Sequence, residues 1–142
     1  ADYKDGLVYT EPDSTLTDGT LTDSKLMWGL GNFSRFIRPG ASRIGVLSYN
    51  MNGKEVPEGD TDPNGIMLSA YKNADNSVVA VIINYSNKDK KMNLEIKNNP
   101  DLVWLPYITS DAKDDNLKRL EKLNGKEINI PAKSIVTFIS GH

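Results

Sequence analysis

The sequence predicts a mainly β protein, an antiparallel β-sandwich of about seven to nine strands preceded by a loop and one α-helix. Three observations support this fold class. Residues 78–83 form a continuous, mostly β-branched apolar run, which is typical of a central strand buried on both faces. Apolar and polar residues alternate over 92–97, as in a strand with one buried face. Short apolar runs recur between turn-forming clusters of Asn, Asp, Pro and Gly as far as residue 139.

The composition excludes several classes of protein. The chain has 142 residues, 38% of them hydrophobic and 25% charged, which suits a folded domain and not a disordered segment. It has no cysteine, and its only histidine is His142, so disulfides, thiolate zinc sites and histidine-based triads are not expected. A net charge of −2 predicts no nucleic-acid partner, and no apolar run of about 18 residues predicts a membrane span. The sequence indicates no cofactor.

The strands follow in order along the second part of the chain. The predicted ranges are 43–49, 66–71, 78–83, 92–96, 102–108, 128–130 and 135–139. Leu117, Leu120 and Leu123 have a spacing that favours a helical turn, with a strand as the alternative.

One helix is predicted over 23–38. Residues 22–24 offer N-cap side chains, and Pro39 ends the helical pattern. An apolar stripe of helical spacing is formed by Leu26, Leu30, Phe33 and Ile37. Gly29 and Gly31 lower the helix propensity, so a neighbouring surface is expected to pack closely against them.

The sequence predicts a long loop over residues 1–22, which are rich in Asp and Thr around the short apolar patch 7–9. Loops of this length in compact domains are usually functional or disordered.

The segment 60–65 matches the first half of a calcium-binding loop, with Asp60, Asp62 and Asn64 as the candidate ligands. Tyr71 occupies the position at which a calcium-binding loop has its bidentate glutamate. The same Asp, Asn, Pro and Gly residues suit a hairpin turn, so the sequence favours a turn over a calcium site.

No catalytic pair is evident. Glycosidases need two carboxylates across one cleft, whereas the glutamates lie in predicted loops or on polar strand faces: Glu11, Glu55, Glu58, Glu95, Glu121 and Glu127. Trp28 and Trp104 suit a sugar-stacking platform, but their spacing favours packing within the protein.

The ordered segments resemble family 30 glycoside hydrolases. Residues 30–40 with 43–44 are similar to the last barrel helix and the domain junction of that family. The segments that resemble its side domain are 68–72, 78–85, 107–110 and 131–138. Residues 2–9 are similar to the segment after the eighth barrel strand in the branch that acts on β-1,6-linked galactan.

The resemblance implies a (β/α)8 barrel paired with an immunoglobulin-like β-sandwich side domain. Residues 1–40 then read as the end of the barrel (loop 1–22, helix 23–38), and 41–142 as the sandwich. The family's two catalytic glutamates lie on barrel strands that precede these segments, so no residue here corresponds to them. The chain begins at Ala1 without methionine, and we expect a C-terminal fragment, inactive alone, of a secreted, periplasmic or cell-surface bacterial enzyme.

In that setting the loop borders the sugar cleft, and the residues expected to contact sugar are Tyr3, Lys4, Asp5 and Tyr9. The expected partner is the barrel; a polysaccharide and self-association through the apolar stripe are further possibilities. An independent carbohydrate-binding module is the alternative, and it requires an exposed row of aromatic side chains. A structural adhesion sandwich and an autonomous enzyme rank below it.

Overall fold

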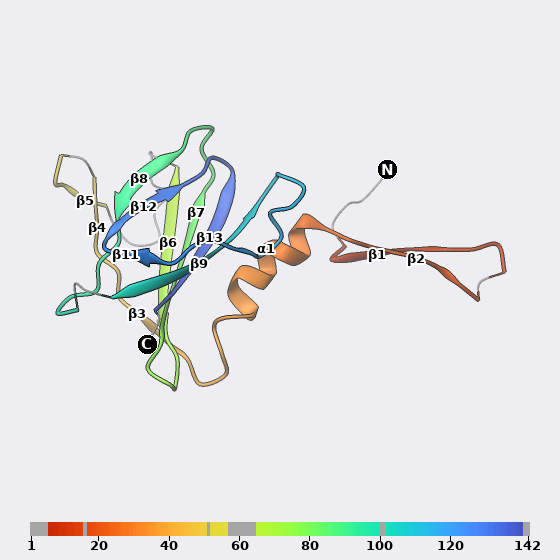
Figure 1. The fold of residues 1–142 in the computed structure, drawn as a ribbon, viewed down its shortest axis with the longest axis horizontal. Coiled ribbons are helices and arrows are strands. Elements are labelled where there is room, and N and C mark those ends of the chain that lie inside the picture. Colours follow the sequence, from red (N-terminus) through yellow and green to blue (C-terminus); the bar gives the residue numbers. More distant parts are fainter. Residues whose placement is uncertain (1–5, 16, 51, 57–64, 100–101, 141–142) are drawn as a thin grey trace.

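A computed structural model describes residues 6–15, 17–50, 52–56, 65–99 and 102–140 (Figure 1). The elements are β1 (Val8–Pro12), β2 (Gly19–Asp23), α1 (Lys25–Ser34), β3 (Ser42–Ile44), β4 (Ser48–Tyr49), β5 (Glu55–Val56), β6 (Ile66–Lys72), β7 (Val78–Asn84), β8 (Lys90–Asn93), β9 (Val103–Ser110), β10 (Lys118–Arg119), β11 (Leu123–Asn124), β12 (Glu127–Ile130) and β13 (Ser134–Ser140). The predicted mainly β class is confirmed.

The main sheet is antiparallel throughout, with strand order β10-β9-β13-β7-β6-β3 and β11 also paired to β9. Strand β13 lies between β7 and β9, so Val136 is opposite both Ile82 and Ile108. A second, two-stranded sheet pairs β12 with β8, and β4 pairs with β5. Every pairing is antiparallel, as the short strands and turn-rich connections predict.

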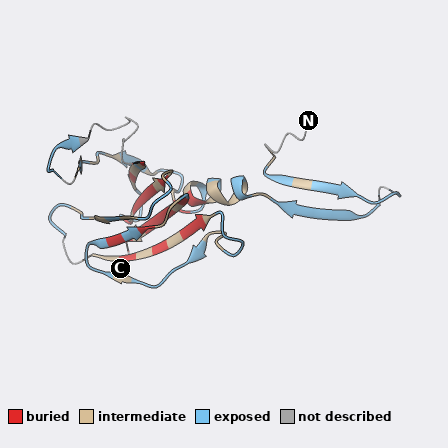
Figure 2. Ribbon diagram, turned by 90° about the horizontal axis from the view of Figure 1, so that it is seen from above, coloured by how far each residue is buried: buried red, intermediate tan, exposed pale blue. Residues whose placement is uncertain are grey.

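The central strands of the main sheet are buried on both faces, because the β12–β8 sheet covers one face and the helix with the turn after it covers the other (Figure 2). Ala80 and Ile82 of β7 face the β12–β8 sheet and pack with Trp104 and Phe138. Val79 and Val81 face the opposite way and pack under Phe36, which follows α1. The uninterrupted β-branched run of β7 therefore reflects burial from both sides, which confirms the reading of 78–83 as a central strand.

The helix is shorter than predicted and ends at Ser34, with a tight turn continuing to Ile37. Ser24 is the N-cap, and its hydroxyl accepts a hydrogen bond from the amide of Met27 at 3.2 Å. A Cβ on Gly31 would lie 2.6 Å from Leu117 Cδ1, and one on Gly29 would lie 3.4 Å from Ile135 Cδ1. The expected close packing at both glycines is therefore present, and the surface that provides it is the domain's own sheet and the loop before β10.

Residues 8–23 form a hairpin, where the sequence predicted a loop. Strands β1 and β2 pair in register, with Tyr9 opposite Thr22 and Thr10 opposite Leu21. Asp13 organises the turn by accepting hydrogen bonds from the amide of Thr15 at 3.0 Å and the amide of Thr17 at 3.3 Å. The β-branched residues on each side of this turn favour extended backbone, and the hairpin projects as an arm beyond the sandwich (Figure 1).

The segment after β9 contains two short strands instead of a helical turn. Arg119 of β10 lies opposite Tyr107, and Leu123 of β11 lies opposite Trp104. The three-residue spacing of the leucines arises because Leu117 packs under the helix while Leu123 packs on the inner core. In the part of the chain that the structure describes, no helix is long and apolar enough to cross a membrane.

Candidate functional site

A buried polar cluster, which we call the helix anchor, fixes α1 to the main sheet. Asn32 is 0% exposed, and its Nδ2 donates to Thr109 Oγ1 at 2.6 Å and to the Trp28 carbonyl at 3.1 Å. Thr137 Oγ1 lies 2.7 Å from the carbonyl oxygen of Asn32 and 3.0 Å from its Oδ1. Since every polar atom of the Asn32 side chain has a partner, the anchor holds the helix in one rotational and axial position on β9 and β13.

The hairpin is tied to the same helix. Trp28 Nε1 donates a hydrogen bond to the Asp23 carboxylate, and both the amide and the hydroxyl of Ser24 donate to the Leu7 carbonyl at 3.0 Å. Lys25 Nζ donates to the Ala112 carbonyl at 2.5 Å, which joins the start of the helix to the loop after β9. A continuous set of hydrogen bonds thus runs from the sheet through the helix to the base of the hairpin.

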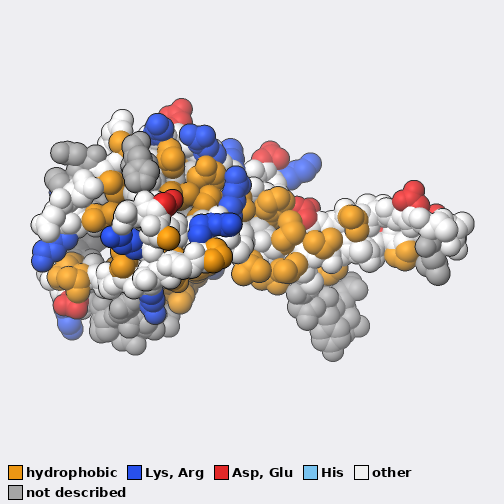
Figure 3. Space-filling view, turned by 90° about the horizontal axis from the view of Figure 1, so that it is seen from below, with side chains coloured by type: hydrophobic (Ala, Val, Ile, Leu, Met, Phe, Trp, Pro, Cys, Tyr) orange, Lys and Arg blue, Asp and Glu red, His pale blue; other side chains and the backbone are white. Residues whose placement is uncertain are grey.

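Exposed apolar side chains gather on the hairpin and helix. Figure 3 shows hydrophobic side chains where the arm meets the sandwich and further ones along the arm. We call this set the apolar face; it consists of Leu7 (41% exposed), Val8 (48%), Leu21 (74%), Leu26 (52%) and Leu30 (51%). The predicted helix stripe is therefore divided: Leu26 and Leu30 are exposed, whereas Phe33 and Ile37 pack on the sheet.

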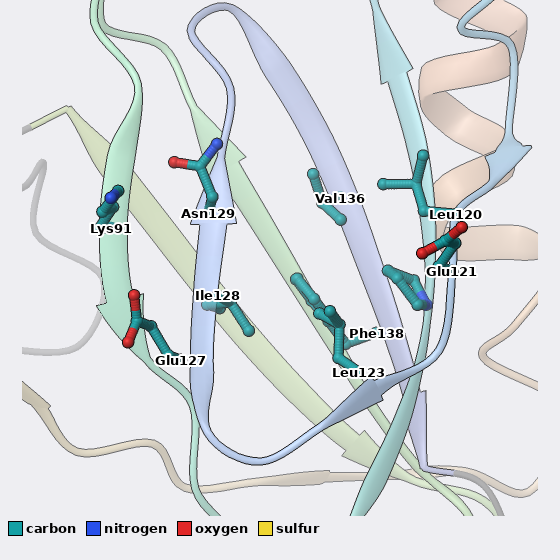
Figure 4. A pocket seen from close by; sticks show the side chains of 10 residues that line it. Lys91, Leu120, Glu121, Leu123, Glu127, Ile128, Asn129, Val136 and Phe138 are labelled. Atoms are coloured by element: carbon teal, nitrogen blue, oxygen red, sulfur yellow. The ribbon is translucent and has the colours of Figure 1, made fainter.

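A groove with a cavity volume of about 480 Å³ lies at the open edge of the sandwich, between β12 and the β9–β11 edge of the main sheet (Figure 4). Val136 and Phe138 form part of its floor, and Glu121, Glu127 and Lys91 lie at its rim. Both glutamates are exposed, so neither has the burial that tunes a catalytic acid.

The remaining described glutamates are also exposed: Glu11, Glu55 and Glu95. Glu95 forms a surface ion pair with Lys126 at 3.0 Å. The carboxyl with a resolved shift is Asp13, where the hydrogen bonds from Thr15 hold the pKa below its usual value. That shift belongs to the exposed turn of the arm, where the Thr15 hydroxyl bonds to the Asp13 carboxylate.

The predicted sugar contacts are only partly within the described residues. Tyr3, Lys4 and Asp5 lie outside them. Tyr9 is half-buried in β1, and its hydroxyl accepts a hydrogen bond from the Gly6 amide at 3.2 Å. The calcium candidates Asp60, Asp62 and Asn64 also lie outside the described residues, and among those described no group of three His, Cys, Asp or Glu side chains is placed to hold a metal ion.

The aromatic side chains that a sugar platform would need are mostly inside the protein. Trp104 is 1% exposed and packs edge-to-face on Phe138, with ring centroids 6.3 Å apart. Tyr107 packs on Phe36 at 4.7 Å, and Trp28 is half-buried with its indole nitrogen bonded to Asp23. These three residues form no exposed row, which removes the main support for an independent carbohydrate-binding module.

Sequence reasoning missed the helix anchor. Asn32 falls in an otherwise apolar stretch of the helix, and its partners Thr109 and Thr137 are 77 and 105 residues away in the chain. A single polar residue on the buried side of an amphipathic helix was the available signal.

An antiparallel sandwich with one helix packed on its main sheet is consistent with the side domain that the sequence resemblance implies. Residues 40–138 match the model of the glycosyl hydrolase family 30 beta sandwich domain. The chain belongs to this family, which confirms the resemblance seen in its sequence. The β-1,6-galactan branch is not tested by this match and stays a prediction.

Known relatives agree with this assignment. The glucuronoxylanase XynC of Bacillus subtilis (strain 168) is 31% identical over 125 residues, which cover 86% of this chain and 26% of that protein. The chain therefore spans about a quarter of the length of this relative.

Solved structures show the same fold. A GH30 endoxylanase from Clostridium papyrosolvens C71 gives a TM-score of 0.63 at 25% identity, covering 85% of this chain and 28% of that one. GH30 xylanase C from Talaromyces cellulolyticus gives 0.63 at 29% identity, covering 87% and 25%. A conserved exported protein from Bacteroides fragilis superimposes with a TM-score of 0.73 at 24% identity, covering 94% and 26%.

Proposed function

We propose that this chain is the accessory domain of a larger family 30 glycoside hydrolase and docks on a (β/α)8 barrel that carries the catalytic glutamates. The observation that carries the proposal is the apolar face. Leu26 and Leu30 are about half exposed on a helix that is otherwise held firmly to its sheet. Exposed apolar clusters of this kind mark contact surfaces.

In this proposal α1 has two roles: the helix anchor attaches it to the sandwich, and the apolar face contacts the barrel. One side of the helix is bonded to β9 and β13, and the adjoining side presents leucines outward. A rigid element with two different faces suits a brace between two domains, because its position on the sandwich sets the position of whatever it contacts.

The reaction of the whole enzyme is proposed as retaining hydrolysis of a β-glycosidic bond through a glycosyl-enzyme intermediate. Both reacting carboxylates are assigned to the barrel. The isolated chain then hydrolyses no glycosidic bond, in keeping with the exposure of its described glutamates.

The hairpin contributes the sugar contacts in this proposal. Its residues alternate between two faces, so Val8 and Leu21 share one face while Tyr9, Glu11, Thr20 and Thr22 share the other. The apolar hairpin face packs toward the barrel and the hydroxyl-rich face borders the cleft, where Tyr9 joins the predicted contacts Tyr3, Lys4 and Asp5.

We also propose that the enzyme is secreted, periplasmic or cell-surface, since an intact polysaccharide is too large to enter a bacterial cell. The neighbouring structure described as an exported protein agrees with this placement.

The coding sequence upstream of Ala1 provides the first test. An in-frame barrel with glutamates at the ends of its fourth and seventh strands is expected. An unrelated domain there, or release of reducing sugar by the purified chain alone, would contradict the proposal.

Docking is tested in trans by mixing the purified chain with the separately expressed barrel and measuring complex formation by gel filtration. The double variant Leu26→Asp/Leu30→Asp should abolish the complex. The matched control is Leu120→Asp, which changes a leucine 36% exposed at the groove on the other side of the main sheet. Equal loss of binding in both variants would assign the effect to misfolding.

The substrate is decided by assaying the whole enzyme on two polymers. The relatives named as xylanases favour xylan, and the resemblance of residues 2–9 favours β-1,6-galactan. Hydrolysis of one polymer and not the other separates the two branches.

A further inference from the structure

We propose that Arg35 and Arg119, which both lie beside Tyr107, form a binding site for the carboxylate of an acidic sugar residue. The two arginines are 84 positions apart in the chain, and both come next to Tyr107 because β10 pairs with β9 and the end of α1 packs on β9. Figure 1 shows α1 next to β9 and β13 of the main sheet.

Cross-strand pairing places Arg119 beside Tyr107. The two residues are directly opposite in the β10–β9 register, so their side chains emerge on the same face of the sheet. Opposed residues in antiparallel strands have Cβ atoms about 5 Å apart. This is the face covered by the helix, since Tyr107 packs with Phe36.

Arg35 lies against the ring of Tyr107. Its Cζ lies 5.5 Å from the ring centroid of Tyr107 and 5.5 Å from that of Phe36. Contact with two aromatic faces orders the guanidinium before any ligand arrives, which lowers the entropy cost of binding.

Neither guanidinium is neutralised by the described part of the chain. Among the described residues, Lys118 pairs with Asp115 and Lys126 with Glu95, and neither Arg35 nor Arg119 takes part in such a pair. Both arginines are exposed. An arginine presents a planar set of N–H donors that matches the two oxygens of a carboxylate, so two exposed arginines beside one tyrosine suit an anionic group.

The position of the site favours a free ligand over a carboxylate of the barrel. At about 100° per residue, Arg35 projects about 180° around the helix from Leu26 and about 140° from Leu30. A partner that covers the apolar face therefore leaves Arg35 and Arg119 open to solvent. The choice of a sugar as the ligand rests on the proposed function in polysaccharide hydrolysis, whereas the preference for an acidic sugar rests on the arginines.

Calorimetric titration of the purified chain at low salt tests the site, with tetragalacturonate as the acidic probe and a neutral galactotetraose as its counterpart. Binding of the acidic probe alone is expected. Arg35→Ala and Arg119→Ala should each weaken it about tenfold, which corresponds to about 1.4 kcal/mol for one charge-assisted hydrogen-bonded pair. Arg35→Lys, which keeps the charge and loses the fork, should fall between wild type and Arg35→Ala.

The control Lys122→Ala removes one exposed positive charge three residues after Arg119. Equal weakening by this control would show non-specific charge attraction and overturn the proposal. So would equal binding of the neutral probe, or no binding of the acidic one.

Tighter binding of an acidic tetrapeptide than of tetragalacturonate would assign the pair to a protein partner instead. Each of these outcomes leaves the barrel-docking experiment unaffected, so the two proposals fail separately.

Discussion

At the scale of single residues, a hydrogen-bonded asparagine sets the position of the helix. Asn32 is fully buried between α1 and the sheet, and its side chain bonds two threonines from different strands and one backbone carbonyl. An apolar residue at this position would remove the partners of buried hydroxyl groups, which costs more than the hydrogen bonds themselves contribute.

Asn32→Ala should lower the free energy of unfolding by about 2–4 kcal/mol, because the Thr109 and Thr137 hydroxyls lose partners in a buried site and a cavity remains. Urea unfolding followed by tryptophan fluorescence measures the change. Asn129→Ala, at an exposed position of β12, should stay within about 0.5 kcal/mol of wild type.

The two helix glycines should respond differently to alanine. Gly29→Ala should raise the free energy of unfolding by about 0.5–1 kcal/mol, because the new methyl group meets Ile135 at an ordinary contact distance of 3.4 Å. Gly31→Ala should gain less or lose stability, since its Cβ would lie 2.6 Å from Leu117 Cδ1. Thermal unfolding of both variants in parallel checks the order; a larger gain at Gly31 would contradict the packing described.

At the scale of elements, the strands were easier to predict than the connections. The run 78–83 identifies β7 because only a strand buried on both faces needs apolar side chains at every position. The β1–β2 hairpin was missed because every residue of β2 is exposed, so no alternation marks it. The short strands β10 and β11 were missed because their leucines pack in different layers.

The candidate site divides in the same way. The apolar stripe was readable from helical spacing, but the sheet covers Phe33 and Ile37 and leaves Leu26 and Leu30 exposed, a division that depends on tertiary packing. The two arginines beside Tyr107 could not be predicted from sequence, because only the β9–β10 register places Arg119 opposite Tyr107.

The turn of the hairpin should open at acidic pH. Thr15 donates to Asp13 through its hydroxyl and its amide, which lowers the pKa of that carboxyl below 3.8 in the folded state. A depressed carboxyl pKa stabilises the turn at pH values above 3.8, and the stabilisation is lost as the pH falls through the lower, folded-state value.

Amide hydrogen exchange at Thr15 and Thr17, followed from neutral pH to pH 2, measures this opening after correction for the intrinsic pH dependence of exchange. In the Asp13→Ala variant, the amides of Thr15 and Thr17 should have low protection factors at every pH. A protection factor at Thr15 that stays constant to pH 2 in the wild type would argue against the carboxylate as the cause.

At the scale of the whole molecule, the helix is the element that two domains share in the proposed enzyme. The sequence resemblance assigns the helix to the barrel end, residues 1–40. In the structure, the helix packs on the outer face of the main sheet. The boundary at residue 40 stays a prediction, and truncation can decide it.

A chain beginning at Ser24 should unfold at nearly the same urea concentration as the full chain, since the removed hairpin projects away from the sandwich (Figure 1). A chain beginning at Ala41 should be much less stable, because Val79 and Val81 lose the cover of Phe36 and its neighbours. Equal stability of the two truncated chains would show that residues 24–40 do not stabilise the sandwich, and would support a domain boundary at residue 40.

The helix anchor has a consequence for how a complete enzyme would lose its structure on heating. A barrel that leaves the helix takes away the outer cover of the sandwich, and a sandwich that unfolds releases the helix from which the barrel is braced. The two domains would then unfold together in a single calorimetric transition. A substitution of Asn32, which removes its hydrogen bonds to Thr109 and Thr137, would also lower the temperature at which the enzyme loses activity, although none of these residues is catalytic.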